Sequence, residues 1–438
     1  MDLDNLDTFR IATCDLNGQM RGKRMPQKDQ RKLASGDLRM PLSVLNVDIW
    51  GADIINSPLL FASGDGDGYL LPTNRGPVPM PWLDQPSALV GMWMFEEDGR
   101  PFEGDPRHAL AQILDRYAAR GWQVVAATEL EFYLIDDSAE SLRPPKDPAS
   151  NRKIDSSAIL SLQQLDAFEA FFSELYQSCA QMGINAQAAS SEAGIGQFEI
   201  SLQHGDALRI ADDTWLFKTL LKGLARKHGY AASFMAKPYP NDAGNGLHLH
   251  FSVIDEAGEN IFDDGTKQGS PLLQNAIAGC LATMRAATLG FAPHANSYTR
   301  MDPENHAPTS ICWGYENRTA ALRIPAGAHR ARRIEHRVAG GDINPFLTLS
   351  LILGAALLGI EDDLTPPPPI TGNAYIQDLP QLIHSWSEAI DMFENDPMIA
   401  RILPAQLIEN FSLTKRQELD GLKNIPQEEH WKIYLETV

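Results

Sequence analysis

The chain has 438 residues, of which 43% are hydrophobic, so it can bury a large core and exceeds the length at which a single core usually stops growing. Its formal net charge of -20 argues against nucleic acid and anionic membranes as partners. The four cysteines lie far apart and form no C-x-x-C pair, which excludes a disulfide framework and a zinc knuckle and favours a reducing, cytoplasmic compartment. The longest apolar run, residues 345–360, is too short to span a bilayer, and the acidic N-terminus does not resemble a signal peptide.

The first hundred residues predict short strands and loops. Residues 8–16 read as a strand that Asn17-Gly18 turns into a hairpin, and residues 42–82 mix short apolar runs with glycine and proline. Asp105 and Pro106 then form an N-cap and first turn, which predicts a helix to about residue 119. We therefore expect an N-terminal domain over residues 1–104 and a second domain over residues 105–438.

The next apolar run, residues 122–135, is a predicted strand that contains Glu129 and Glu131. Because residues two apart share one face of a strand, these carboxylates repel unless a cation neutralises them, although exposure at a sheet edge would also explain them. A second strand, residues 197–202, carries Glu199 on its polar side, and Glu192 precedes it across a glycine-containing turn. Four carboxylates therefore lie in or beside predicted strands.

Helices are expected at residues 160–182 and 213–228, separated from the first strand by a proline-bearing loop over residues 138–156. A glycine-rich loop at residues 241–246 leads into His248, His250 and Ser252, which alternate along a strand. Histidines that are merely hydrogen-bonded in a core are the alternative. Because carboxylates outnumber imidazoles here, a metal site would suit magnesium or manganese better than zinc. Residues 345–360 predict a buried helix capped by Asp342 or Asn344.

Residues 296–337 are rich in positive charge, although the chain as a whole is acidic. All the basic charge of this stretch comes from arginine, because it contains no lysine. A guanidinium offers a planar fork to carboxylate or phosphate oxygens, so this usage favours an anion site over a solvated basic strand. Glu335 alternates with two of these arginines and should share their strand face. Since Arg318 and Arg323 are five residues apart, a turn or bulge must separate them if both reach phosphate. The arginines are Arg300, Arg318, Arg323, Arg330, Arg332, Arg333 and Arg337.

No phosphate-binding loop of the G-x-x-x-x-G-K-[ST] type and no G-x-G-x-x-G opening a helix occurs in the sequence. A nucleotide, if bound, would be held by metal and arginine. Six motifs in order then resemble the glutamine synthetase family: E-L-E-F-Y-L at Glu129, E-x(3)-G-Q-F-E at Glu192, G-N-G-L-H-L-H-F-S at Gly244, N-S-Y-x-R at Asn296, E-N-R-T-A-A-L-R-I-P at Glu316 and R-R-I-E-H-R at Arg332. The W-G-Y-E-N-R-T form is more similar to the γ-glutamylpolyamine synthetase branch.

The resemblance implies an α+β fold with a small N-terminal β-grasp domain and a catalytic domain whose curved antiparallel sheet is flanked by helices. It implies self-association into a double-ring homo-oligomer, usually a dodecamer, with active sites between neighbouring subunits. The implied reaction joins glutamate to an amine with ATP through γ-glutamyl phosphate. Two divalent cations, Mg²⁺ or Mn²⁺, would take part, one held by Glu131, Glu192 and Glu199 and the other by Glu129, His248 and Glu335.

Further roles follow from the resemblance residue by residue. Residues implied to bind the nucleotide are His250, Ser252, Arg318, Arg323 and Arg330. Those implied to bind glutamate are Glu131, Gly244, Asn245, Gly246, Arg300 and Arg337. Those implied to act in catalysis are Arg300, Arg318, Arg337, His306 and Asp48, the last from a neighbouring subunit.

Two departures from the family concern the amine. His306 replaces the mobile glutamate that closes the ammonia site, and no tyrosine lies between residues 134 and 175 to bind ammonium. We therefore expect a polyamine or small alkylamine as substrate, in a wider pocket lined by Trp313, Tyr315 and the loop over residues 138–156. Ammonia as substrate and a binding protein without turnover are the alternatives.

Overall fold

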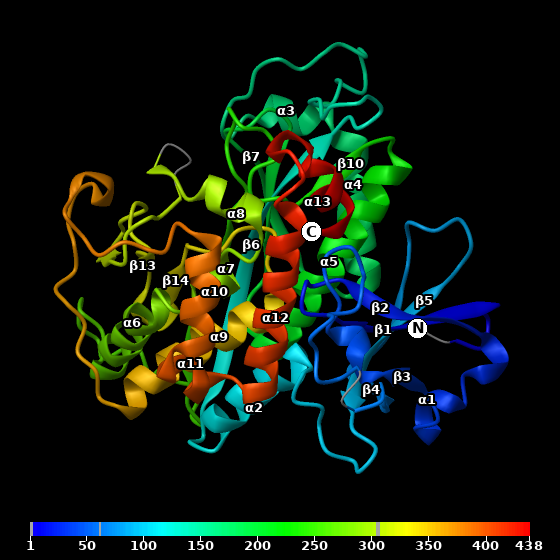
Figure 1. The fold of residues 1–438 in the computed structure, drawn as a ribbon. Helices are drawn as coiled ribbons and strands as arrows, with labels where there is room; N and C mark the ends of the chain where they lie inside the picture. The colour runs from blue at the N-terminus through cyan, green and yellow to red at the C-terminus, as the bar shows by residue number, and fades with distance from the viewer. Residues whose placement is uncertain (1–2, 61–62, 304–306) are drawn as a thin grey trace.

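The computed structural model describes residues 3–60, 63–303 and 307–438. Its N-terminal part is built around a five-stranded sheet with the order β2-β1-β5-β4-β3, in which β1 and β5 run parallel and the other pairs are antiparallel. Figure 1 shows this sheet to one side of the molecule. The predicted first hairpin is present. The strands are β1 (Thr8–Cys14), β2 (Met20–Pro26), β3 (Arg39–Pro41), β4 (Asp67–Pro79) and β5 (Ala88–Phe95).

The larger sheet has nine strands among the described residues. Its main path is β12-β13-β14-β11-β6-β8-β7, with β9 and β10 also paired to β6, and only β12 and β13 run parallel. With helices packed around this mostly antiparallel sheet, the α+β fold expected from the sequence is confirmed. The strands are β6 (Gln123–Ile135), β7 (Ala186–Ser191), β8 (Gln197–Leu202), β9 (Gly205–Asp206), β10 (Ala231–Ser233), β11 (Leu247–Ile254), β12 (Trp313–Tyr315), β13 (Leu322–Ile324) and β14 (Ile334–His336).

The α-helices are α1 (Lys32–Ser35), α2 (Pro106–Ala118), α3 (Leu162–Ala167), α4 (Glu169–Met182), α5 (Ala207–Lys227), α6 (Pro271–Met284), α7 (Thr288–Phe291), α8 (Ala295–Arg300), α9 (Pro345–Glu361), α10 (Trp386–Asn395), α11 (Pro397–Ile402), α12 (Ala405–Leu422) and α13 (Trp431–Thr437). Short 3-10 turns occur at Gln27–Asp29, Leu42–Leu45, His329–Ala331, Ala374–Ile376 and Gln427–Glu429. In the described part of the chain, no helix combines the length and apolar character that crossing a membrane requires.

The apolar helix α9 lies at the centre of the larger core and packs against α6, α2 and α5. Of the two caps considered for it, Asn344 is the one that accepts hydrogen bonds from the backbone N–H groups of Phe346 and Leu347. Its approach to α6 is close enough to require glycine. A Cβ on Gly279 would lie 2.1 Å from a backbone oxygen of α9, which no side chain tolerates.

Two predicted helices have different bounds in the structure. The helix expected over residues 160–182 divides at Phe168 into α3 and α4, because Phe168 leaves the helical conformation. The helix expected from residue 213 begins earlier, at Ala207, because the Asp206 side chain caps it by accepting from the N–H of Arg209. The predicted strand over residues 197–202 and the start of α2 after Asp105 agree with the structure.

Polar contacts join the small sheet to the rest of the chain. The Asn17 amide in the first hairpin donates to Glu418 on α12 at 2.8 Å, and Asn344 donates to the carbonyl of Asp15 at 2.8 Å. Arg75 on β4 pairs with Asp213 on α5, with an N–O distance of 2.8 Å. Residues of β1 and β5 also belong to the main hydrophobic core. The two sheets are therefore packed as one body rather than loosely tethered.

Candidate active site

The register of the larger sheet creates an acidic face. Glu131 on β6 lies opposite Glu199 on β8, and Glu129 lies opposite His248 on the other neighbour, β11. On the far side of β11, His250 lies opposite Glu335 on β14. Side chains directly opposite each other on adjacent strands have Cβ atoms about 5 Å apart. Strand pairing alone therefore gathers these groups from four separate stretches of sequence.

Glu129 is the hub of this face. One carboxylate oxygen lies 3.2 Å from His248 Nδ1 and the other lies 3.1 Å from His250 Nε2. Burial works to raise the pKa of Glu129, but hydrogen bonds from the two histidines outweigh it and hold that pKa well below its usual range. The carboxylate is therefore ionised and forms the border between two groups of donor atoms.

The neighbouring carboxyls behave differently. Burial, and then the charges of Glu129 and Glu131, raise the pKa of Glu199 to about 9. Burial, and then the charge of Glu131, raise the pKa of Glu192 to about 7. Without a cation this face holds acidic groups that cannot all ionise at neutral pH. A divalent cation would resolve the conflict, because it favours the ionised form of every carboxylate around it.

Two groups of side chains have donor atoms that lie within 4.8 Å of one another: Glu129, Glu199 and His248, and Glu129, His250 and Glu335. Carboxylate oxygens with one imidazole nitrogen suit Mg²⁺ or Mn²⁺. The grouping differs from the expected one, since His250 joins the second set and Glu129 takes part in both. In neither set do Glu131 or Glu192 appear. Glu131 instead accepts from the backbone N–H of Gly246 at 2.6 Å.

A cavity of about 610 Å³, here called the acidic cavity, opens over this face. Three of the predicted arginines line it together with the carboxylates, and its walls therefore combine sites for cations and for anions. Arg300 is buried and donates to the carbonyl of Val338 at 2.9 Å. The lining includes Glu129, Glu131, Glu192, Glu199, His248, Arg300, Arg318, Arg337 and Tyr375.

The glycine-rich loop borders the acidic cavity. A Cβ on Gly244 would lie 2.7 Å from Arg300 Cγ, and one on Gly246 would lie 3.0 Å from an Arg300 guanidinium nitrogen. The glycines therefore make room for the arginine. Asn245, predicted to bind glutamate, has a fully buried side chain that donates to the carbonyls of Ser233 and Met235. Its amide braces the loop and does not line the cavity.

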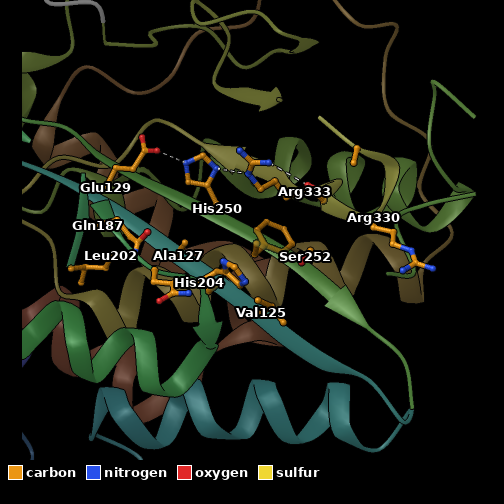
Figure 2. A pocket seen from close by; sticks show the side chains of 15 residues that line it. Val125, Ala127, Glu129, Gln187, Leu202, His204, His250, Ser252, Arg330 and Arg333 are labelled. Atoms are coloured by element: carbon orange, nitrogen blue, oxygen red, sulfur yellow. Dashed lines mark hydrogen bonds and ion pairs between the residues drawn. The ribbon is translucent and has the colours of Figure 1, made fainter. Parts of the chain in front are cut away.

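A second cavity of about 550 Å³, here called the histidine cavity, is also lined by Glu129 (Figure 2). His250, Ser252 and Arg330, three of the residues predicted to bind a nucleotide, line it. Figure 2 also shows Arg333, whose Nε donates to His250 Nδ1 at 3.3 Å. Glu129 is a lining residue of both cavities.

Some predicted site residues lie elsewhere in the described chain. Arg323 is separated from Arg318 by a turn, as expected, but donates to Glu335 at 2.7 Å and lines neither cavity. Asp48 is 3% exposed, and its carboxylate accepts from its own turn and from Gln417. A role for Asp48 in a neighbouring subunit stays a prediction. His306 lies outside the described residues.

The residues expected around the amine do not line the acidic cavity, and their role there stays a prediction. Trp313 is buried and donates its indole N–H to the carbonyl of Pro367, while the Tyr315 hydroxyl donates to the carbonyl of Gln268. Neither these aromatic residues nor the loop over residues 138–156 appears among the described residues that line the acidic cavity. Ile159 and Leu160, just after that loop, line it instead.

The sequence assigned no specific role to several residues that line the cavities. Arg333 had a signal, since it alternates with Glu335 and Arg337 along one strand face. Tyr375 and His204 had none, because neither belongs to a recognisable motif and only the folded chain brings them to the acidic cavity and the histidine cavity, respectively. Arg332 is structural, with its guanidinium donating to the carbonyls of Thr266 and Lys267.

Comparison with known proteins identifies the family of this chain. The profile of the glutamine synthetase catalytic domain matches residues 103–434. The chain belongs to the glutamine synthetase family, a family of carbon–nitrogen ligases that use ATP and divalent metal ions.

The names of two relatives within the family specify different amines. The chain is 35% identical to gamma-glutamylputrescine synthetase PuuA of Escherichia coli (strain K12) over 420 residues, 95% of this chain and 89% of that protein. It is 32% identical to the glutamate–isopropylamine ligase of Pseudomonas sp, covering 95% and 92%. It is 30% identical to the glutamine synthetase of Thermus thermophilus, covering 96% and 94%. A crystal structure of a novel glutamine synthase homolog superimposes with a TM-score of 0.86 at 26% identity over 100% of both chains.

Proposed function

We propose that the protein ligates an amine to the γ-carboxyl group of glutamate at the expense of ATP. The observation that carries the proposal is that Glu129 lines both the acidic cavity and the histidine cavity. ATP in the histidine cavity would direct its γ-phosphate toward Glu129, and glutamate in the acidic cavity would present its γ-carboxylate from the other side. That carboxylate attacks the γ-phosphorus, the bond to ADP breaks, and γ-glutamyl phosphate forms. The amine then displaces phosphate and loses a proton.

The proposal assigns metal ions to the carboxylates and histidines, and it assigns the anionic groups of the substrates to the arginines. Divalent cations, when bound, would neutralise the phosphate oxygens as the phosphoryl group moves. We assign them to Glu129, Glu199 and His248, and to Glu129, His250 and Glu335, with Glu131 and Glu192 close enough to the cavity to contribute. Arg300 and Arg337 would hold the glutamate carboxylate and the transferring phosphate. Arg318, Arg330 and Ser252 would contact the nucleotide, and Arg323 would join them only by leaving Glu335.

The amine is proposed to be an alkylamine or polyamine. Support comes from the two relatives at 35% and 32% identity, whose names specify putrescine and isopropylamine. It also comes from the absence of a tyrosine between residues 134 and 175. Ammonia is the second candidate substrate, since the Thermus thermophilus relative at 30% identity is a glutamine synthetase. An inactive binding protein is the weakest candidate, because an idle site gains nothing from carboxyls held close enough to raise one another's pKa.

The assembly is proposed on family grounds. A double-ring dodecamer would bring Asp48 of one N-terminal domain, residues 1–104, beside the catalytic domain, residues 105–438, of its neighbour. All four cysteines are free and buried, which supports a cytoplasmic location.

The experiment that tests the reaction is phosphate release with ATP, Mg²⁺ and glutamate, screened against ammonia and a panel of amines. We expect kcat/KM for an alkylamine or polyamine at least tenfold above that for ammonia, which corresponds to roughly 1.4 kcal/mol of discrimination. Preference for ammonia over every amine would identify a glutamine synthetase. No phosphate release with any acceptor would favour the inactive binding protein.

A further inference from the structure

Two large apolar side chains stand in solvent at the acidic cavity. Ile159 is 63% exposed and Leu160 is 71% exposed, yet both belong to the cavity lining. The other described walls are mostly carboxylates, arginines and small polar groups. Single exposed apolar residues are common on protein surfaces, but an adjacent pair at the edge of a charged cavity places apolar surface where a ligand must pass.

The backbone fixes this pair in place. Leu160 has a φ of +58°, in the left-handed region that a leucine enters only at a cost. Its N–H donates to the carbonyl of Ser191 at 2.8 Å, and the next N–H, of Ser161, donates to the Ser191 hydroxyl at 2.7 Å. Ser191 is fully buried at the end of β7. The strained residue is therefore tied to the sheet and does not belong to a loose loop.

The same strand end carries a carboxyl of the site. Glu192 follows Ser191 directly, lines the acidic cavity, and has a backbone N–H that donates to the carbonyl of Gln197 at 2.9 Å. Beyond the pair, the Ser161 side chain caps α3, which lies against β7 (Figure 1). The position of Ile159 and Leu160 relative to the carboxyls is thus set from both sides by hydrogen bonds.

From this geometry we propose that Ile159 and Leu160 form an apolar lip that binds the carbon chain of the amine substrate and selects alkylamines over ammonia. The proposal rests on the ligase function proposed above and names its specificity residues. A primary amine has a polar end that must reach the acyl phosphate and an apolar chain that must lie somewhere else. Isoleucine and leucine side chains can cover the carbon chain of the amine. Ammonia has no carbon chain and gains no such contact.

The apolar lip predicts how kcat/KM depends on the length of the carbon chain of the amine. Each methylene group removed from water contributes enough to multiply kcat/KM by about four, until the chain outgrows the lip. The lip contains no counter-charge, so the gain comes from methylene groups and not from a second ammonium. We therefore expect log kcat/KM to rise steadily from methylamine through ethylamine and propylamine to butylamine.

The test measures that series for the wild type and for Leu160→Asn, with Ile159→Thr as a second variant. Asparagine tolerates a positive φ, so Leu160→Asn removes apolar surface while keeping the backbone conformation. We expect the gain per methylene to fall below about twofold and kcat/KM for butylamine to fall about tenfold, while ammonia kinetics and the KM for glutamate stay within about twofold. The matched control is Leu162→Asn, because Leu162 is 73% exposed but does not line the cavity.

The outcomes separate the two proposals. If the wild type turns over amines but Leu160→Asn keeps the wild-type slope, the lip is wrong and the ligase function stands. If Leu160→Asn changes only the size of the particle by light scattering, the pair is a contact between copies of the chain and the lip is again wrong. If no amine supports phosphate release, the proposed function fails and the lip fails with it.

Discussion

Replacing Glu199 by glutamine should make the metal-free protein more stable while abolishing its activity. The physical reason is that burial, and then the charges of Glu129 and Glu131, disfavour the ionised form of Glu199 and raise its pKa from 4.5 to about 9. Glutamine has nearly the same shape but no charge to lose. The substitution therefore removes the conflict together with the metal ligand.

The size of the effect follows from the two pKa values. At pH 7 the carboxyl is ionised in the unfolded chain, with a pKa near 4.5, but protonated in the folded chain. The unfolded state gains about 3 kcal/mol from this ionisation, and Glu199→Gln abolishes that gain. A chain of 438 residues unfolds with an entropy of about 0.9 kcal/mol per kelvin, so the melting temperature should rise by about 3 °C.

The pH dependence of stability tests the sign of the difference between Glu199→Gln and the wild type. The folded protein binds more protons than the unfolded chain between pH 4.5 and about 9, so this carboxyl makes metal-free wild type less stable as pH rises through that window. The advantage of Glu199→Gln should be absent at pH 4.5, reach about 3 °C at pH 7, and grow until pH 9. Mg²⁺ at 1,000 times Kd should reverse the order at pH 7, because it adds about 4.1 kcal/mol to the wild type, more than the difference of about 3 kcal/mol between the metal-free proteins.

The assay is thermal unfolding at one protein concentration, in chelator and in Mg²⁺, across this pH range. Glu140→Gln serves as the control, because Glu140 is exposed and does not line the acidic cavity. We expect it to match the wild type under every condition. Should Glu199→Gln melt below the wild type in chelator at pH 7, the carboxyl would be ionised and stabilised in the metal-free protein. The reasoning about charge conflict would then be refuted.

Three further predictions follow from other contacts. Glu129→Ala or His248→Ala should abolish phosphate release and the stabilisation by Mg²⁺ seen in melting curves, and full activity in excess chelator would rule out this metal site. Arg107→Ala leaves Asp212 buried without its partner and should cost 3–5 kcal/mol in chemical denaturation, whereas Arg401→Ala in an exposed pair should cost at most about 1 kcal/mol. Asp48→Asn and Arg337→Ala proteins should partly restore activity when dissociated, mixed and reassembled, and a fully active monomer by light scattering would overturn the shared site.

Local rules account for much of what the sequence determined. Asp105 caps α2 because its carboxylate accepts a hydrogen bond from the N–H of Arg107, and Ile334, Glu335 and His336 form the expected strand, β14. The family motifs likewise indicated the chemistry, since they list most of the charged residues that line the acidic cavity. Such features depend on neighbours a few residues away, and a sequence records those neighbours directly.

Tertiary structure decided how these residues are paired. Glu129 faces His248 and not another carboxyl because β11 pairs with β6 in one register, which the packing of apolar faces selects across more than a hundred residues. That register also gives Glu129 to both donor groups, where the motifs had placed it in one. Leu160 lines the cavity with a positive φ and with its N–H bonded to the carbonyl of Ser191, which lies 31 residues further along the chain. The packing of the whole core determines which distant residues lie next to each other. A local sequence pattern therefore does not predict these contacts.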